Sequence, residues 1–166
     1  MTILLRPAVE ADIEAIMIIH NQGICDRIAT LDLEPHTLEQ KTQWFLQHGP
    51  REPIIVACDE DRVVGFASLS LFSPRACYAH VSSLSIYMAR SHRGRGIGKE
   101  LLGALVELGR AAGYRKIILN AFDFNEAAMA LYRSFGFRHV GTYEKQGLLD
   151  GRWVDTVIME KHLTVE

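Results

Sequence analysis

The sequence is short of cysteine, proline and aromatic residues, carries little excess of either charge and has no long apolar run. Its 166 residues include 3 cysteines, 5 prolines and 8% aromatic side chains. The 20 acidic and 18 basic residues leave a net charge of −2, which provides no basic field for sequence-independent binding of nucleic acid. No apolar stretch reaches the roughly 18 residues that a membrane-spanning helix needs. We therefore expect neither nucleic acid nor a membrane among its partners.

The three cysteines, Cys25, Cys58 and Cys77, are odd in number and widely spaced. Such a set fits neither a disulfide framework nor a structural zinc site. We therefore expect buried free thiols and no bound metal. Residues 1–12 contain an arginine and two acids before the apolar core of a signal peptide could form, so a cytoplasmic protein is expected.

The sequence is rich in apolar residues, which make up 48% of it. At this length, that content is enough for one domain over residues 1–166 with a sizeable core. Apolar residues recur with a period that alternates between two and about 3.6, which predicts an α/β fold of the α+β type with about four helices and a mixed sheet. The expected strands cover residues 2–7, 54–58, 62–71, 78–88, 116–120, 137–143 and 154–160, and the expected helices cover residues 11–24, 38–49, 97–112 and 125–135.

The expected strand over residues 78–88 has one small, polar face. Its alternation places Leu84 and Ile86 on one side, and Ser83 and Ser85 on the other. In the middle of a small domain, such a face predicts that the strand lines a cavity. The alternative is that the serines face an exposed sheet surface.

A glycine-rich run, RGRGIG at residues 93–98, separates that strand from the next helix. Glycines at a helix start let a ligand approach unpaired backbone N–H groups, which suits a pyrophosphate; the alternative is a simple strand-to-helix turn. The run is not a P-loop, because Lys99 is followed by Glu100 and not by the hydroxyl residue that holds magnesium. It also lies too far along the chain for a dinucleotide-binding fingerprint. Hydride and phosphoryl transfer are therefore disfavoured.

Two motifs in order resemble those of one family. The run at residues 93–98 is similar to the R/Q-x-x-G-x-G/A acetyl-CoA loop of the GNAT acetyltransferase superfamily. The run NEAAMALYRSFGF at residues 125–137 resembles the family's N-x-x-A and L-Y-x-x-x-G-F helix. Residues 21–30, the Trp44-Phe45 pair and residues 147–155 are similar to the phosphinothricin, methionine sulfoximine and arsinothricin N-acetyltransferase group.

This resemblance implies a single GNAT fold, with a mostly antiparallel sheet and a splayed central strand. It implies transfer of an acetyl group from acetyl-CoA, as co-substrate and without a metal, directly to the amine of a small amino-acid-like molecule. An activity of the antibiotic- or herbicide-resistance type and a homodimer are implied as well. The alternatives are an acetyltransferase of protein or peptide amino termini and a catalytically silent acyl-CoA-binding module.

The resemblance also assigns residues to acetyl-CoA. Backbone N–H groups of the glycine loop would hold the pyrophosphate, those of the splayed strand would hold pantetheine and the thioester oxygen, and an asparagine would contact the cofactor or simply cap its helix. These residues are Ile86, Tyr87 and Met88 in the strand; Arg93, Gly94, Arg95, Gly96, Ile97, Gly98 and Lys99 in the loop; and Asn125.

The expected catalytic residues are Tyr132, Ser83 and Ser85. Tyr132 matches the family's general acid, whose phenol protonates the departing thiolate; the alternative is a core aromatic. Ser83 stands where this branch usually has a glutamate that deprotonates the substrate ammonium. Serine cannot act as that base, so either a water near Ser83, Ser85 and another carboxylate relays the proton, or the substrate arrives as free amine, or activity is lost. His80 lies on the opposite strand face.

The acceptor substrates of this group carry anionic groups, which call for arginine. Arg75, just before the central strand, is the first candidate, and Arg27 is the second. Both could instead be solvated surface side chains. Thr30 and Tyr87 are expected to line the same pocket.

Overall fold

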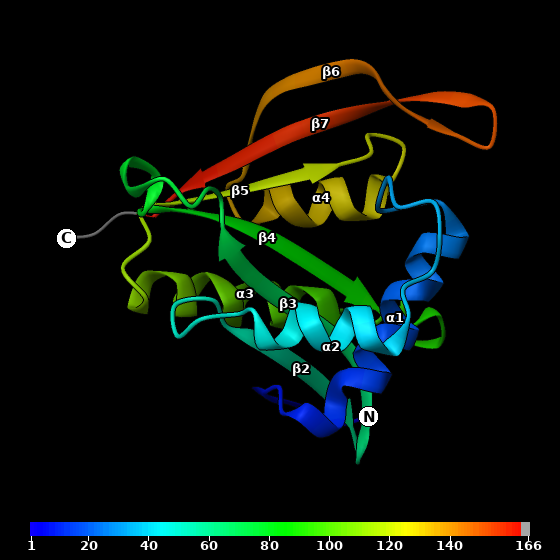
Figure 1. Cartoon of the computed structure of the whole chain (residues 1–166), viewed down its shortest axis with the longest axis vertical. Helices are drawn as coiled ribbons and strands as arrows, with labels where there is room; N and C mark the ends of the chain where they lie inside the picture. Colours follow the sequence, from blue (N-terminus) through cyan, green and yellow to red (C-terminus); the bar gives the residue numbers. More distant parts are fainter. Residues whose placement is uncertain (164–166) are drawn as a thin grey trace.

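The computed structural model describes residues 1–163 as a seven-stranded sheet with helices on both faces (Figure 1). The strands are β1 (Ile3–Pro7), β2 (Ile54–Asp59), β3 (Arg62–Leu71), β4 (Val81–Met88), β5 (Lys116–Ala121), β6 (Arg138–Leu149) and β7 (Arg152–His162). The helices are α1 (Ile13–Asp26), α2 (Leu38–Leu46), α3 (Ile97–Ala111) and α4 (Glu126–Ser134), with short 3-10 turns at Glu10–Asp12, Ala76–Tyr78 and Arg90–His92. The expected element order and fold class are confirmed.

The sheet has the strand order β1-β2-β3-β4-β5-β7-β6. Among these strands β4 and β5 form the one parallel pair, and they are paired only at Val81–Lys116, Ser82–Ile117 and Ser83–Ile118. β4 continues to pair with β3 as far as Met88, whereas β5 turns away from it. The expected splayed central strand is therefore confirmed, and Figure 1 shows the two strands separating.

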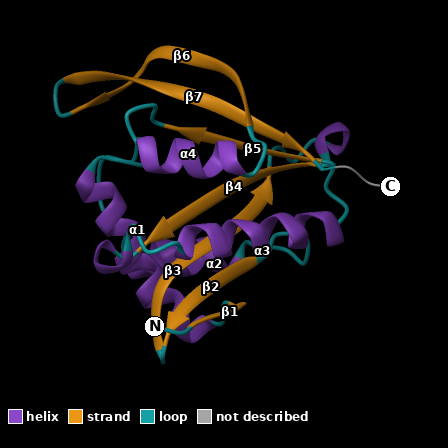
Figure 2. Cartoon of the chain, turned by 180° about the vertical axis from the view of Figure 1, so that it is seen from behind, coloured by secondary structure: helices purple, strands orange, loops and turns teal. Residues whose placement is uncertain are grey.

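Helices cover the two faces of the β2–β4 region differently. Leu101, Leu102 and Leu105 of α3 are fully buried against one face, which Figure 2 shows from behind. On the other face α1 packs through Ile16 and Ile19 against β2 and β3, and α2 lies over α1. The apolar residues that recur about every 3.6 positions in α1 and α3 are thus the ones that form the buried face of each helix.

Several local expectations differ from the structure. β4 begins at Val81 because the preceding residues Ala76–Tyr78 form a 3-10 turn. The prediction of buried thiols is correct for Cys58 in β2 and wrong for Cys25 and Cys77. Cys25 lies on the outer side of the last turn of α1, and Cys77 lies in the exposed turn. None of the helices in the described part of the chain is both long and apolar enough to cross a membrane.

Candidate active site

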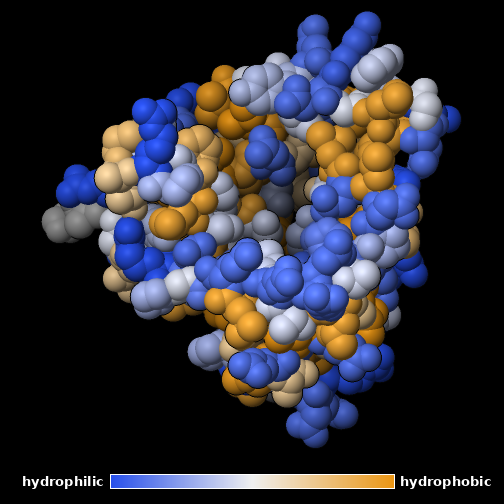
Figure 3. All heavy atoms as spheres, viewed as in Figure 1, coloured by the Kyte–Doolittle hydropathy of each residue, from blue (hydrophilic) through white to orange (hydrophobic). Residues whose placement is uncertain are grey.

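Two adjoining cavities lie where β4 and β5 separate. One of about 480 Å³, here called the strand cavity, is lined by β4, the ends of β5 and α4, and the loop after α1. The other, of about 310 Å³, is lined by the glycine-rich loop before α3 and is called the glycine-loop cavity. Tyr87, Asn125 and Tyr132 line both. Figure 3 shows a hollow near the centre of this face.

The backbone of the glycine-rich loop adopts conformations that only glycine takes without strain. Gly94 and Gly96 have φ values of +74° and +83°. A Cβ at either position would meet no atom within 4 Å, so backbone conformation rather than crowding selects glycine, and space remains above the loop. Gly96 is also the N-cap of α3, where the helix dipole and free N–H groups attract anions. The loop therefore fits an approaching pyrophosphate.

The cationic residues around this loop differ in their availability. The Arg93 guanidinium lines the glycine-loop cavity but donates to Asp26 at 2.7 Å, and Arg90 donates to the same carboxylate. These two guanidinium groups hold the pKa of Asp26 below its usual value. The Arg95 side chain does not line the cavity, and the Lys99 N–H already donates to the Gly96 carbonyl at 3.2 Å. Lys99 can therefore serve an anion mainly through its side chain.

The backbone of β4 supplies donors and acceptors to the strand cavity. Ile86, Tyr87 and Met88 pair with β3 along one edge, through Ala67, Phe66 and Gly65. Along the other edge this stretch has no pairing with β5. Such unpaired N–H groups, fixed in a partly buried wall, are suited to stabilise a developing oxyanion.

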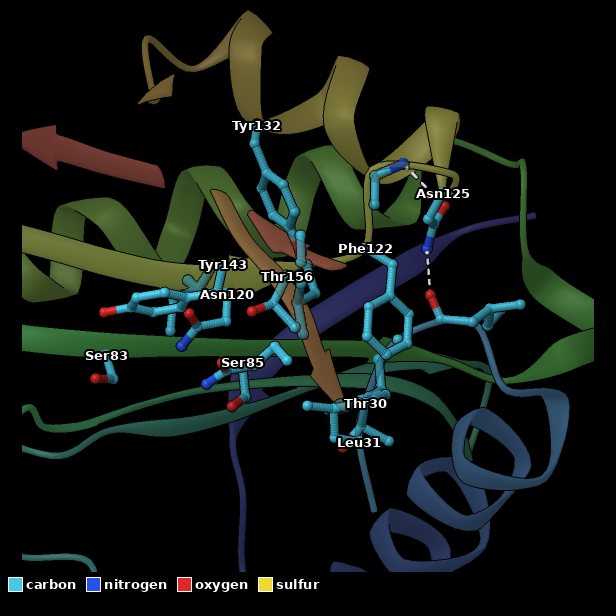
Figure 4. A pocket seen from close by; sticks show the side chains of 18 residues that line it. Thr30, Leu31, Ser83, Ser85, Asn120, Phe122, Asn125, Tyr132, Tyr143 and Thr156 are labelled. Carbon is cyan, nitrogen blue, oxygen red and sulfur yellow. Dashed lines mark hydrogen bonds between the residues drawn. The ribbon is translucent and has the colours of Figure 1, made fainter. Parts of the chain in front are cut away.

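Asn125 both caps α4 and ties it to the loop after α1. Its Oδ1 accepts from the Ala128 N–H, and its Nδ2 donates to the Ile28 carbonyl, each at 3.2 Å (Figure 4). The expected N-cap is confirmed. Because Asn125 lines both cavities, it also fixes where their common wall lies.

The Tyr132 side chain extends from α4 into the strand cavity (Figure 4). It is 8% exposed, and burial raises the pKa of its phenol well above the usual value, with a smaller contribution from Tyr87. The phenol is therefore protonated throughout the physiological range, which is the form a proton donor requires.

The polar groups that line the strand cavity are uncharged. Ser83 and Ser85 line it from β4, as expected. No aspartate, glutamate, histidine, lysine or arginine lines it within residues 1–163. Sequence reasoning missed several lining residues, which are Leu31, Asn120, Phe122, Tyr143, Gln146 and Thr156. Figure 4 labels all of these except Gln146. For Asn120 a signal existed, since it is a polar residue directly after the apolar run of residues 117–119.

The two candidate arginines lie outside the strand cavity, whereas Thr30 lines it. Arg27 ends α1 and donates to the Asp150 carboxylate at 3.1 Å and to the carbonyl groups of Asp32 and Leu33. Its guanidinium thus holds the loop after α1. Arg75 is exposed, begins the 3-10 turn before β4 and lines neither cavity.

A buried polar cluster lies behind the cavity wall, between α1 and α2. Lys41 is 1% exposed, and its Nζ lies 2.8 Å from His20 Nδ1 and 4.1 Å from the centre of the Trp44 ring. Burial lowers the pKa of Lys41 to about 8, against the opposing charge of Asp32. Burial, together with the positive charges of Lys41 and His36, lowers the pKa of His20 to about 3.

His20 should make the protein sensitive to acid. Between pH 6.5 and about 3 the unfolded chain binds a proton at this residue and the folded protein does not, so stability falls as the pH falls. The slope from this group is about 1.4 kcal/mol per pH unit. In urea unfolding from pH 7 to 4, His20→Gln should lose stability less steeply than the unmodified protein. His139→Gln, an exposed control, should keep the original slope; equal slopes for both variants would contradict this assignment.

The model of the acetyltransferase (GNAT) family matches residues 22–137, which include β4, the glycine-rich loop and α4. The chain belongs to the GNAT acetyltransferase family. It is an acetyl-CoA-dependent N-acetyltransferase.

This GNAT chain is similar in sequence or structure to the following three acetyltransferases. It is 31% identical over 165 residues to an L-methionine sulfoximine/L-methionine sulfone acetyltransferase of Pseudomonas paraeruginosa, covering 98% of this chain and 96% of that protein. A phosphinothricin acetyltransferase of Sinorhizobium meliloti, solved in complex with acetyl-CoA, is 34% identical, with a TM-score of 0.93 over 98% of this chain and 89% of that one. A ribosomal-protein-alanine N-acetyltransferase of Brucella melitensis is 37% identical, with a TM-score of 0.92 over 96% and 99%.

Proposed function

We propose that this enzyme acetylates the amine of a small amino-acid-like molecule whose side chain is polar and uncharged. The observation that carries this is the wall of the strand cavity, where hydroxyl and amide groups replace charged ones within the described residues. Placing an anionic side chain there without a paired cation costs free energy, whereas a neutral oxygen or nitrogen finds hydrogen-bond partners. The sulfoximine and sulfone acceptors of the Pseudomonas relative are of this neutral kind.

The proposed roles follow the geometry of the two cavities. The N–H groups of the glycine-rich loop would hold the pyrophosphate, and Lys99 would add its side-chain charge. The backbone of residues 86–88 would stabilise the thioester oxygen as the amine attacks. Tyr132 would give its proton to the departing thiolate. These assignments are supported by the positive φ of Gly96, the unpaired edge of β4 and the protonated, cavity-facing phenol.

A matched pair of acceptors tests the preference for a neutral side chain. We expect kcat/KM for methionine sulfone to exceed that for phosphinothricin by at least about tenfold, because only the latter has an anionic side chain. Thiol release from acetyl-CoA measures both. Gln146→Lys places a cation at the exposed mouth of the cavity and should shift the ratio towards phosphinothricin. Gln43→Lys, on the exposed side of α2, should leave the ratio unchanged; a preference for phosphinothricin in the unmodified enzyme would refute the proposal.

Acetylation of protein amino termini is a second candidate, favoured by the 37% identity to the Brucella relative. The loop after α1 argues against it, because Ile28, Thr30 and Leu31 form one wall of the strand cavity and narrow the space for a polypeptide. An alanine-initiated peptide in the same thiol-release assay separates the two. A kcat/KM above that of methionine sulfone would establish the protein substrate.

We further propose that residues 1–166 act as one cytoplasmic domain that forms a homodimer through β6 and β7. The support is an apolar surface on this hairpin, where Val140, Leu148 and Trp153 are each at least 46% exposed. β6 is also the last strand of the sheet, with one edge open to pairing. The free cysteines suit a reducing compartment.

A further inference from the structure

The acceptor amine needs a base that the strand cavity itself does not provide. An aliphatic amine is largely protonated at neutral pH and attacks a thioester only after losing a proton. Within residues 1–163 the cavity wall holds no carboxylate or imidazole. If the enzyme acetylates such an amine, as proposed above, the proton must leave through groups that connect the cavity to an acceptor outside it.

The carboxylate of Asp32 lies outside the strand cavity and is hydrogen-bonded to a residue of the cavity wall. Thr30 lines the cavity, and its hydroxyl donates to Asp32 Oδ2 at 3.0 Å. The Asp32 backbone N–H donates to the same Thr30 oxygen at 3.2 Å, which fixes the orientation of the hydroxyl. The Asp32 side chain is 43% exposed, so a proton that reaches it can pass on to solvent.

Tyr87 connects Thr30 to the reacting region. It lines both cavities, and the Thr30 side chain, which lines the strand cavity with it, lies near enough to its phenol to oppose the rise of its pKa. Its ring is held by His20 at 4.5 Å and by stacking on Phe66 at 5.5 Å between ring centres. Tyr132 lines the same two cavities, so the two tyrosines border the same space.

Two imidazole rings and two cationic side chains lie around Asp32. Nε2 of His20 and Nε2 of His36 each lie 3.6 Å from Asp32 Oδ2. Lys41 adds its positive charge from α2, behind His20, and Arg27 donates to the Asp32 backbone carbonyl. Tyr87 is the titratable group that faces this cluster from β4. His20 does not compete for the proton, because its pKa of about 3 keeps it neutral.

We propose that Tyr87, Thr30 and Asp32 form a proton relay that removes the proton from the acceptor ammonium in the strand cavity. The ammonium gives a proton to the Tyr87 oxygen while the Tyr87 hydroxyl proton passes to Thr30 and the Thr30 hydroxyl proton passes to an Asp32 oxygen. The free amine then forms the new C–N bond and the C–S bond breaks. Tyr132 gives its hydroxyl proton to the departing sulfur and takes up the second proton from the acceptor nitrogen in its place. Asp32 then releases its proton to solvent. Tyr87 touches the acceptor; Thr30 and Asp32 act through it.

The pH dependence of kcat/KM for the acceptor tests this relay. At pH 7, Asp32→Asn and Thr30→Val should each lower it by about 100-fold, the range of general base catalysis. Above pH 9, where free amine is abundant, both variants should recover to within about threefold of the unmodified enzyme. Thr30→Ser keeps the hydroxyl and should retain the original profile. Asp61→Asn, in the exposed β2–β3 turn, is the control for loss of a carboxylate.

Two further measurements separate a relay from a structural role. Acetyl-CoA affinity by calorimetry should be unchanged in Asp32→Asn, which shows that the fold and donor site are intact. Adding Ser83→Glu places a carboxylate directly in the cavity wall and should restore at least about tenfold of the lost activity at pH 7. A loss in Asp32→Asn that is equal at every pH, or no loss at all, overturns the relay. If the unmodified enzyme releases no thiol with any amine, the proposed function fails instead.

Discussion

Replacing Tyr132 by phenylalanine should lower kcat by about 100-fold or more while the KM for acetyl-CoA changes by less than about threefold. The hydroxyl is the sole group removed, and the ring that packs beside Phe137 remains. Without the phenol, the thiolate must leave unprotonated or take its proton from water. Because this interaction forms only as the C–S bond breaks, the loss belongs to kcat and not to donor binding.

A second tyrosine provides the control for Tyr132→Phe. Tyr114 is fully buried in the core, and its hydroxyl has no hydrogen-bond partner among the described residues. Tyr114→Phe therefore removes the same atom away from the cavities and should leave kcat unchanged. Steady-state kinetics with saturating acceptor measures both variants. An unaltered kcat in Tyr132→Phe would remove this phenol from the mechanism.

Gly96→Val should raise the KM for acetyl-CoA by about 100-fold. The valine must adopt a φ of +83°, which costs about 1–3 kcal/mol in a β-branched residue, and the loop relaxes away from this conformation. Its side chain would also occupy the open space above the N-terminus of α3. Both effects act on the place where the pyrophosphate must approach the backbone.

Gly113 is a matched control for Gly96. It follows α3 at the opposite end, has a φ of +87°, and a Cβ there would likewise meet no atom within 4 Å. Gly113→Val should therefore cost comparable stability in thermal unfolding while leaving the KM for acetyl-CoA near its original value. Equal effects of the two variants on KM would mean that strain alone, and not the anion site, explains Gly96→Val.

The fold could be predicted because its signals are local. The alternation of residues in β4, the stripe of α3 and the capping residues Thr37 and Asn125 all lie within a few positions of the structure they specify. Thr37 accepts from the Gln40 N–H and Asn125 from the Ala128 N–H, as the residue types indicate. The anion-binding shape of the glycine-rich loop could be predicted for the same reason, because it depends only on the contiguous residues 93–98.

The rest of the site depends on contacts between distant residues. Arg27 looked available for an anionic substrate because nothing near it in sequence indicates Asp150, 123 residues away. Likewise the contact of Asn125 with Ile28 spans 97 residues, and it brings the loop after α1 to the cavity. The role of Asp32 depends on His20, Lys41 and Tyr87 meeting behind that loop. Periodicity and motif spacing carry no information on such encounters.

The separation of β4 from β5 gives the sheet an unpaired edge in its interior. Open strand edges invite pairing with other chains and so promote aggregation, and proteins commonly protect them. Here the edge extends only from Leu84 to Met88, and α4 and the loop after α1 enclose the gap beside it. A foreign β-strand would have to displace these two segments before it could pair with the edge. The geometry that exposes the backbone to a substrate thus also shields it from self-association.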